Sequence, residues 1–167
     1  MRDEVLLDDW HPVIAGTQLA PGTRTSVRLL DLEIVVWRGA DGVVHAWEDR
    51  CPHRGTRLSI GRVEGDELVC AYHGWRFAGT GQCTTFPALP DVTPPATAYA
   101  RVYSATERYG LVWVCVGDAP AAVLSFPEYD DPHLRKVVCG AYAVNAGGPR
   151  IVEILQDQPT ATRMGRK

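Results

Sequence analysis

Residues 51–75 read CPHRGTRLSIGRVEGDELVCAYHGW, and the two ends of this stretch share one pattern. A cysteine and a histidine stand close together at each end, as Cys51-x-His53 and Cys70-x-x-His73. Two thiolates and two imidazoles are a donor set that suits zinc or an iron–sulfur cluster. Because two such pairs rarely fall so close together by accident, the stretch predicts a metal centre whose ligands come from two loops.

The distribution of the four donors separates zinc from a two-iron cluster. Common zinc sites place two cysteines in one knuckle and two histidines in another, or use four cysteines. Here each arm supplies one cysteine and one histidine, so each loop can give one ligand to each of two irons. Two histidines in place of two cysteines on one iron define a Rieske [2Fe–2S] centre. The spacing favours this cluster, and a structural zinc module stays open as an alternative.

Residues beside the four predicted ligands suit a backbone that approaches a cluster closely. Pro52 stiffens the link within the first ligand pair. Gly55 and Gly74, each shortly after a histidine, leave room for the backbone to come near the cluster. Backbone N–H groups aimed at the sulfurs would then help to set the reduction potential. We expect Trp75 to cover one side of the cluster and limit the access of water.

Composition and charge argue against several classes of protein. Apolar residues make up 46% and charged residues 22%, as in globular proteins, and the net charge of −3 comes without a basic stripe for nucleic acid. The opening MRDEVLLDDWHPV lacks the basic and apolar regions of a signal peptide. No apolar run reaches the roughly 18 residues that a membrane span requires. We therefore expect a soluble protein of the bacterial cytoplasm, with no nucleic-acid or membrane partner.

The other cysteines and the histidine at position 45 are expected to be structural. The chain has five cysteines, an odd number that fits a disulfide framework poorly. Cys115 and Cys139 lie in β-like apolar runs, and Cys83 lies in the turn-rich run GTGQCTTF. We expect these three to be small packing residues. The same role is expected of His45 in VVHAW.

Short β-branched and aromatic runs, separated by Gly, Pro and Asp, predict an all-β fold. The expected strands cover residues 25–30, 33–37, 42–47, 67–72, 76–83, 100–106, 110–116 and 136–144. Their spacing favours antiparallel sheets in a sandwich or open barrel, with a small two-loop subdomain for the cluster. Helix is expected only as single turns in LLDDW and in residues 125–136. We expect residues 1–148 to form this domain and 149–167 a weakly ordered tail.

One long segment, WEDRCPHRGTRLSIGRVEGDELVCAYHGWRFAGTGQCTTFPALP, resembles the N-terminal domain of Rieske non-haem iron oxygenases. These are the large subunits of aromatic-ring hydroxylases and O-demethylases, and the similarity extends over residues 5–155. The resemblance implies a Rieske fold. It also implies a [2Fe–2S] cluster with Cys51 and Cys70 on the inner iron and His53 and His73 on the outer one.

A comparison within this class concerns the reduction potential. Rieske proteins of the respiratory-chain type have an extra cysteine in each loop and a serine after the second His-Gly, a group that raises the potential. The present chain has Thr56, Ala71 and Trp75 at those three positions. We therefore expect a potential toward the low end of the Rieske range of roughly −150 to +300 mV.

The resemblance also implies a second metal, a mononuclear Fe(II) held by two histidines and a carboxylate. In the family its first ligands follow Glu-Asn-x-x-Asp-x-x-His-x₄-His, and PRIVEILQD (149–157) is similar to the start of that motif. The similarity then ends, because Ile154 replaces the Asn, and Thr160 and Gly165 replace the two histidines. No histidine follows His133. We infer that this chain lacks the mononuclear site, as a truncated or frame-shifted gene product would.

The function that the resemblance implies is electron transfer within a ring-hydroxylating or O-demethylating oxygenase system. A reductase or ferredoxin would supply electrons, which would pass toward a mononuclear iron that this chain lacks. Full-length relatives imply a homotrimer, and whether this chain is an enzyme by itself stays open. Arg54 and Arg57 are candidates for docking an acidic donor. The alternative is a free-standing Rieske-type ferredoxin.

Overall fold

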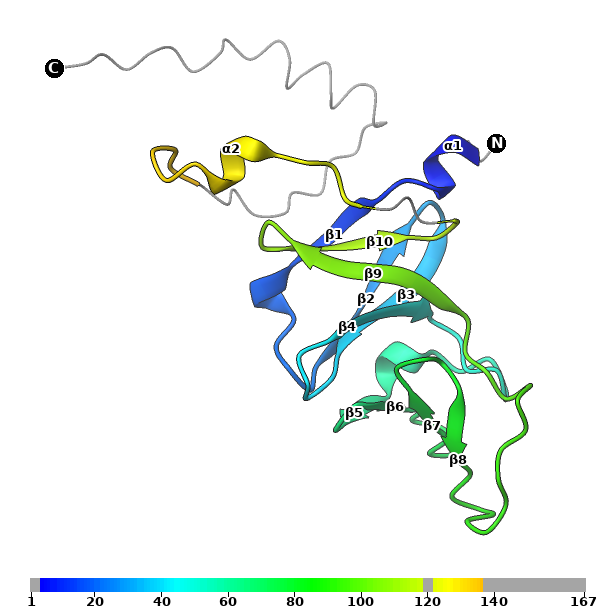
Figure 1. Ribbon diagram of the computed structural model, residues 1–167. Helices are drawn as coiled ribbons and strands as arrows, with labels where there is room; N and C mark the ends of the chain where they lie inside the picture. The colour runs from blue at the N-terminus through cyan, green and yellow to red at the C-terminus, as the bar shows by residue number, and fades with distance from the viewer. Residues whose placement is uncertain (1–3, 119–121, 137–167) are drawn as a thin grey trace, which may run out of the picture. The chain divides into compact units, whose positions relative to one another are not determined.

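The computed structural model describes residues 4–118 and 122–136, which lie in one compact unit (Figure 1). Its earlier elements are α1 (Glu4–Leu7), β1 (His11–Ala15), the 3₁₀ turn η1 (Gly16–Gln18), β2 (Arg24–Leu29), β3 (Leu32–Arg38) and β4 (Val44–Glu48). The later ones are the 3₁₀ turn η2 (Leu58–Ile60), β5 (Arg62–Glu64), β6 (Glu67–Val69), β7 (Arg76–Ala78), β8 (Cys83–Thr85), β9 (Val102–Arg108), β10 (Leu111–Cys115) and α2 (Pro127–Asp130).

Six strands form one antiparallel sheet in the order β1-β10-β9-β4-β3-β2. The turn between β2 and β3 is tight, because Leu29 pairs with Leu32 across it. The turn between β3 and β4 contains the Asp-Gly pair, and Gly42 adopts the left-handed φ of +85° that favours glycine there. Figure 1 shows the sheet coiled into an open, barrel-like layer. The prediction of an all-β fold with antiparallel sheets is confirmed.

Strand β3 buries both of its faces, which explains its unbroken apolar run. Ile34 and Val36 pack into one core cluster, among residues of β9 and β10. Val35 and Trp37 pack into a second cluster, because side chains alternate between the two faces of a strand. The second cluster also contains Trp47 of β4, whose ring meets Trp37 edge-on at 5.1 Å.

The four shorter strands form a second antiparallel sheet in the order β5-β6-β7-β8. This sheet packs on the second core cluster through Leu68 of β6 and Phe77 of β7. The ring of Phe77 meets Trp47 edge-on, with 6.3 Å between centroids. The two sheets therefore contribute side chains to one shared core. The smaller sheet corresponds to the predicted two-loop subdomain.

Two predicted strands end earlier than the sequence suggested. The run 76–83 is two strands, β7 and β8, because Gly81 reverses the chain with a φ of +90°. A Cβ at Gly81 would lie only 2.5 Å from the carbonyl oxygen of Ala100. The run 67–72 stops at Val69, since Cys70 begins a loop. Apolar composition alone did not reveal either boundary.

Two strands were not predicted. β1 has Pro12 in its interior, which is tolerated because β1 is an edge strand of the six-stranded sheet. β5 is three residues long and mostly polar. In contrast, α2 is a single helical turn within 125–136, as expected, and α1 is a single turn that begins two residues before the predicted LLDDW and ends at Leu7.

Several predictions lie outside the described residues. They are the predicted strand 136–144 after residue 136, the packing role of Cys139, the domain boundary between residues 148 and 149, and the tail 149–167. Among the residues that are described, no helix is long and apolar enough to cross a membrane.

Leu58 anchors the start of η2 in the second core cluster, and Leu58→Ala tests its contribution. The side chain is fully buried, so we expect the free energy of unfolding to fall by about 2–5 kcal/mol. The matched control is Ile60→Ala in the same 3₁₀ turn, where the side chain is 60% exposed. Urea unfolding should show a change within about 0.5 kcal/mol for the control. Equal losses for both variants would contradict this account of the core.

Candidate metal centre

Two loops of similar backbone geometry present the predicted ligands. In the first ligand loop (residues 49–57) the Cys51 N–H donates to the Thr56 carbonyl at 2.8 Å, and the Gly55 N–H donates to the Cys51 carbonyl at 2.9 Å. Gly55 has a φ of +74°, the left-handed region in which a side chain is disfavoured. The loop therefore folds back on its own cysteine.

The second ligand loop (residues 70–75) repeats these bonds. The Cys70 N–H donates to the Trp75 carbonyl at 2.9 Å, and the Gly74 N–H donates to the Cys70 carbonyl at 3.1 Å. Gly74 has a φ of +69°. In both loops the glycine thus follows the cysteine by four residues, whereas the histidine follows by two in one loop and by three in the other. Both glycines were singled out in the sequence, and closure of the loop is the observed reason for them.

The two predicted cysteine ligands lie inside the protein as neighbouring free thiols. Cys51 and Cys70 are each 2% exposed. Burial, together with the adjacent Cys70, raises the pKa of the Cys51 thiol to about 11, against backbone N–H groups of His53 and Arg54 that favour the thiolate. A bound cation would reverse this balance, because it stabilises thiolates directly. The predicted backbone N–H groups near a sulfur are therefore present at Cys51.

The two predicted histidine ligands lie at the surface with one nitrogen of each ring turned toward the other. The Nδ1 atoms of His53 and His73 are 3.2 Å apart. Desolvation lowers the pKa of His53, and so do the neighbouring His73 and Arg54. Two nitrogens bound to one tetrahedral metal at about 2.05 Å would lie about 3.3 Å apart. The observed separation thus fits a pair of ligands on a single ion.

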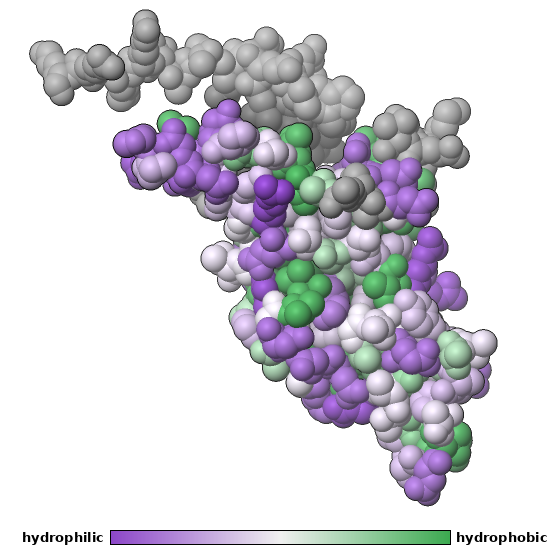
Figure 2. Space-filling view, in the orientation of Figure 1, coloured by the Kyte–Doolittle hydropathy of each residue, from purple (hydrophilic) through white to green (hydrophobic). Residues whose placement is uncertain are grey.

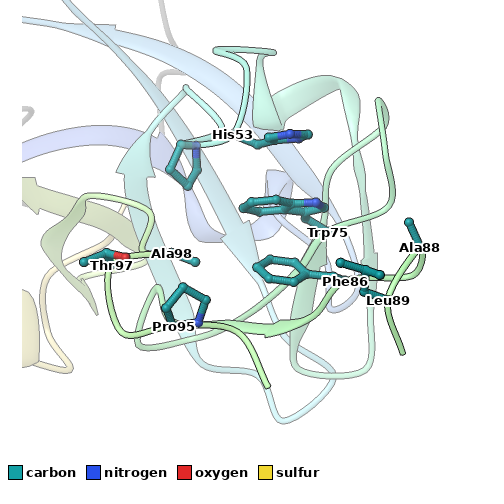
Figure 3. Close-up of a pocket in the computed structure, with 9 residues that line it drawn as sticks. His53, Trp75, Phe86, Ala88, Leu89, Pro95, Thr97 and Ala98 are labelled. Atoms are coloured by element: carbon teal, nitrogen blue, oxygen red, sulfur yellow. The ribbon is translucent and has the colours of Figure 1, made fainter. Parts of the chain in front are cut away.

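Trp75 covers one face of His53. Their rings are stacked, with 4.3 Å between centroids and 6° between planes, and Phe86 packs against the other side of the indole (Figure 3). A cavity of about 440 Å³ opens beside this stack. Its remaining lining is small or apolar: Pro52, Ala88, Leu89, Pro95, Thr97 and Ala98. The prediction that Trp75 shields one side of the site agrees with this stacking.

A smaller cavity of about 240 Å³ lies at another edge of the two loops. Thr56 and Ala71 line it together with Ile60 and Tyr72. Thr56 and Ala71 are the positions at which Rieske proteins of the respiratory type have their extra cysteines. The structure brings these two positions to one small cavity, where neither residue can form a disulfide.

The two arginines predicted to dock a partner differ in their surroundings. The exposed Arg57 is paired with carboxylates of the same chain, because its guanidinium lies 2.9 Å from the Glu33 carboxylate and 3.9 Å from that of Asp49. Arg54 is exposed beside His53. This difference was not visible in the sequence, because it depends on where Glu33 of β3 lies relative to the first ligand loop.

His45 is a packing residue, as expected. Its ring stacks on Trp37 with 4.2 Å between centroids. Burial lowers its pKa, whereas Asp41, Asp66 and the Gly79 backbone raise it. Of the other cysteines, Cys83 and Cys115 are buried and free, which agrees with their predicted structural role.

One residue of the site was missed from the sequence. Asp49 is 4% exposed and is the only buried charged or polar residue recorded in the described part of the chain. Its carboxylate accepts two hydrogen bonds from Ser59, one from the backbone N–H at 2.7 Å and one from the hydroxyl at 2.6 Å. A possible signal was present in the sequence, since Asp49 is an acidic residue between the buried Trp47 and Cys51.

The arrangement of the predicted ligands agrees with a two-iron cluster. A Rieske cluster needs two protein ligands on each iron. The Nδ1 atoms of His53 and His73 are 3.2 Å apart, and the buried thiols of Cys51 and Cys70 are neighbours. Within residues 4–118 and 122–136, no group of three or more His, Cys, Asp or Glu side chains converges on a single ion.

Comparisons with known proteins agree with this geometry. The family model described as Rieske [2Fe-2S] domain matches residues 9–100. The chain is 38% identical over 133 residues to the oxidoreductase NdmD of Pseudomonas putida, covering 79% of this chain and 22% of that protein. It is 35% identical over 161 residues to methylxanthine N1-demethylase NdmA of the same organism, covering 92% of this chain and 46% of that one.

A solved structure agrees as well. Pseudomonas putida CBB5 NdmA matches with a TM-score of 0.72 and 35% identity, over 79% of this chain and 42% of that chain. The chain therefore spans less than half the length of these relatives.

The lowered pKa of His45 predicts how stability changes below neutral pH. As the pH falls through about 6.5, the unfolded chain takes up a proton at His45 before the folded protein does, so the free energy of unfolding falls. Because the ring is only partly buried, we expect this loss to be under about 1 kcal/mol between pH 7.5 and 5.5. Urea unfolding of the wild type and of His45→Gln measures it, and the variant should lose less over that window. The same pH slope in both proteins would contradict the prediction.

Proposed function

This chain belongs to the Rieske [2Fe-2S] domain family, and on that premise we propose that it transfers electrons through a cluster bound by two cysteines and two histidines. Cys51 and Cys70 would hold the inner iron, and His53 and His73 the outer one. When bound, the cluster supplies reversible one-electron transfer. The observation that supports this assignment best is the 3.2 Å separation of the two Nδ1 atoms above a buried pair of thiols.

The burial of the four side chains supports a direction for electron entry and exit. The cysteines are enclosed by the core, whereas His73 is exposed and His53 is partly exposed. Electrons would thus enter and leave at the histidine edge. The cysteine side would stay dry, which strengthens the amide contacts to the sulfur. The indole of Trp75 restricts the motion of His53 and excludes water from one of its faces.

We propose further that the partners are those of an oxygenase system. The relatives include an oxidoreductase, NdmD, and a demethylase, NdmA, and both are longer than this chain. A reductase or ferredoxin would donate the electron, and a mononuclear iron would accept it. Among the described residues, no group of three or more His, Cys, Asp or Glu side chains converges on one ion. The segment 149–157, which resembled the start of that site, lies outside the described residues.

Purified protein tests the cluster directly. We expect a brown protein with two irons and two sulfides per chain, a reduced-state EPR signal, and a midpoint potential in the lower half of the roughly −150 to +300 mV range. Cys70→Ser should lose most of the bound iron, because it removes a ligand. Cys83→Ser is the matched control, since Cys83 is a buried cysteine of the same core cluster but not a proposed ligand.

Two outcomes would contradict the assignment. One is a colourless protein that binds one zinc per chain with the same four residues. The other is a Cys70→Ser variant that keeps the iron and the EPR signal of the wild type. Loss of iron in Cys83→Ser as well would show that the effect of Cys70→Ser is not specific to ligation.

Arg54 is the exposed cation beside the histidine edge, and Arg54→Glu tests whether it assists docking of an acidic donor. Stopped-flow reduction by NdmD, used as a probe donor, should slow by about tenfold at low salt, and the difference should shrink as salt screens the charges. Arg28→Glu, an exposed substitution in β2, should leave the rate within about twofold. An unchanged rate and salt dependence for Arg54→Glu would rule out the docking role.

A further inference from the structure

The two ligand loops are closed at their bases in different ways. The second ligand loop connects β6 and β7, and the residues on either side of it, Val69 and Arg76, are paired in the ladder of that hairpin. The first ligand loop has no such pair. It leaves β4, which pairs with β3 and β9, and it ends in η2, a single 3₁₀ turn. Beyond the two backbone hydrogen bonds that each loop makes within itself, a strand ladder fixes the base of the second loop only.

The Asp49 side chain spans the base of the first ligand loop. Asp49 lies two residues before Cys51, and its carboxylate binds Ser59, which lies beyond the loop in η2. Both oxygens of the carboxylate are used, Oδ1 by the Ser59 N–H at 2.7 Å and Oδ2 by the Ser59 hydroxyl at 2.6 Å. The backbone N–H of Asp49 donates to the Glu33 carbonyl at 2.9 Å, which ties the same residue to β3.

Arg57 adds a charge contact from the end of the loop. Its Nε lies 3.9 Å from Asp49 Oδ2, and its Nη2 lies 2.9 Å from the Glu33 carboxylate. The side chain of Asp49 is completely buried, and a buried carboxylate is costly unless hydrogen bonds and an opposite charge compensate it. These contacts compensate it only while both ends of the loop are together. Opening the loop would leave the carboxylate without them.

We propose that Asp49 is a positioning residue that closes the first ligand loop in place of a strand pair, and so holds Cys51 and His53 in their ligating arrangement. The role of Asp49 in positioning the two ligands rests on the proposed function. The closure of the loop can be measured separately, in protein without the cluster. The second ligand loop does not need such a residue, because the β6–β7 ladder closes it.

The experiment compares Asp49→Asn and Ser59→Ala with the wild type. Cluster loss is followed by the visible absorbance after a ferrous chelator is added to the purified holoprotein. A hydrogen bond to a charged group is worth about 1.5–3 kcal/mol, or roughly ten- to hundredfold in an equilibrium, so Asp49→Asn should lose the cluster at least about tenfold faster. Ser59→Ala keeps the backbone N–H donor and should show a smaller increase.

The matched control is Asp41→Asn. Asp41 also accepts a hydrogen bond from a backbone N–H in a turn, that of Val43, and the substitution removes its charge in the same way. Its rate of cluster loss should equal that of the wild type. Hydrogen–deuterium exchange then separates a local from a global effect. In Asp49→Asn we expect faster exchange in residues 50–59 and unchanged exchange in residues 70–76.

Cluster-free protein makes the two possible failures distinguishable. If the wild type binds no [2Fe–2S] cluster, the proposed function is wrong, and exchange in residues 50–59 of the cluster-free chain still decides whether Asp49 closes the loop. If Asp49→Asn keeps its cluster and its exchange pattern at wild-type rates, the positioning role is wrong. Equally faster exchange in both ligand loops would also overturn it, because the effect would then be global.

Discussion

The metal centre depends on one geometric constraint, the 3.2 Å approach of two imidazole nitrogens that belong to different loops. Neither loop can satisfy it alone. Each must fold back on its own cysteine, and both must rest on a common support. The support is the core cluster that Trp47 of the larger sheet shares with Leu68 and Phe77 of the smaller one. The position of the two imidazoles therefore depends on the packing of the two sheets as well as on the loops that contain them.

The surroundings of two of the predicted ligands disfavour charge on them when no metal is bound. Burial disfavours the Cys51 thiolate, and desolvation together with a neighbouring imidazole disfavours the charged form of His53. A metal binds thiolates and neutral imidazoles, so a bound cation would compensate the charge of the Cys51 thiolate that burial disfavours. The only buried carboxylate of the described core lies at the base of the first ligand loop and not among the four donors.

The surface around the histidine edge combines apolar and charged groups. Tyr72 and Leu89, 62% and 55% exposed, each line one of the two cavities, and Arg54 is exposed near His53. Figure 2 shows apolar residues near the tip of the β8–β9 connection, with hydrophilic residues around them. Because electrons pass over short distances only, a partner would have to contact this edge. Of the two arginines predicted to dock a donor, Arg57 already forms an ion pair with Glu33.

The sequence by itself determined the all-β class, and it predicted the four donors and the glycines of the two loops, because each follows from local chemistry or from the period of apolar residues. The tertiary structure decided the rest. Within 76–83 the turn-rich GTGQC did not show where the strand breaks, because Phe77 and Cys83 on either side of Gly81 pack into the same core. Asp49 resembled any surface carboxylate until Ser59 and the loop enclosed it. Its role depends on which distant residues surround it, and only the folded chain brings those residues together.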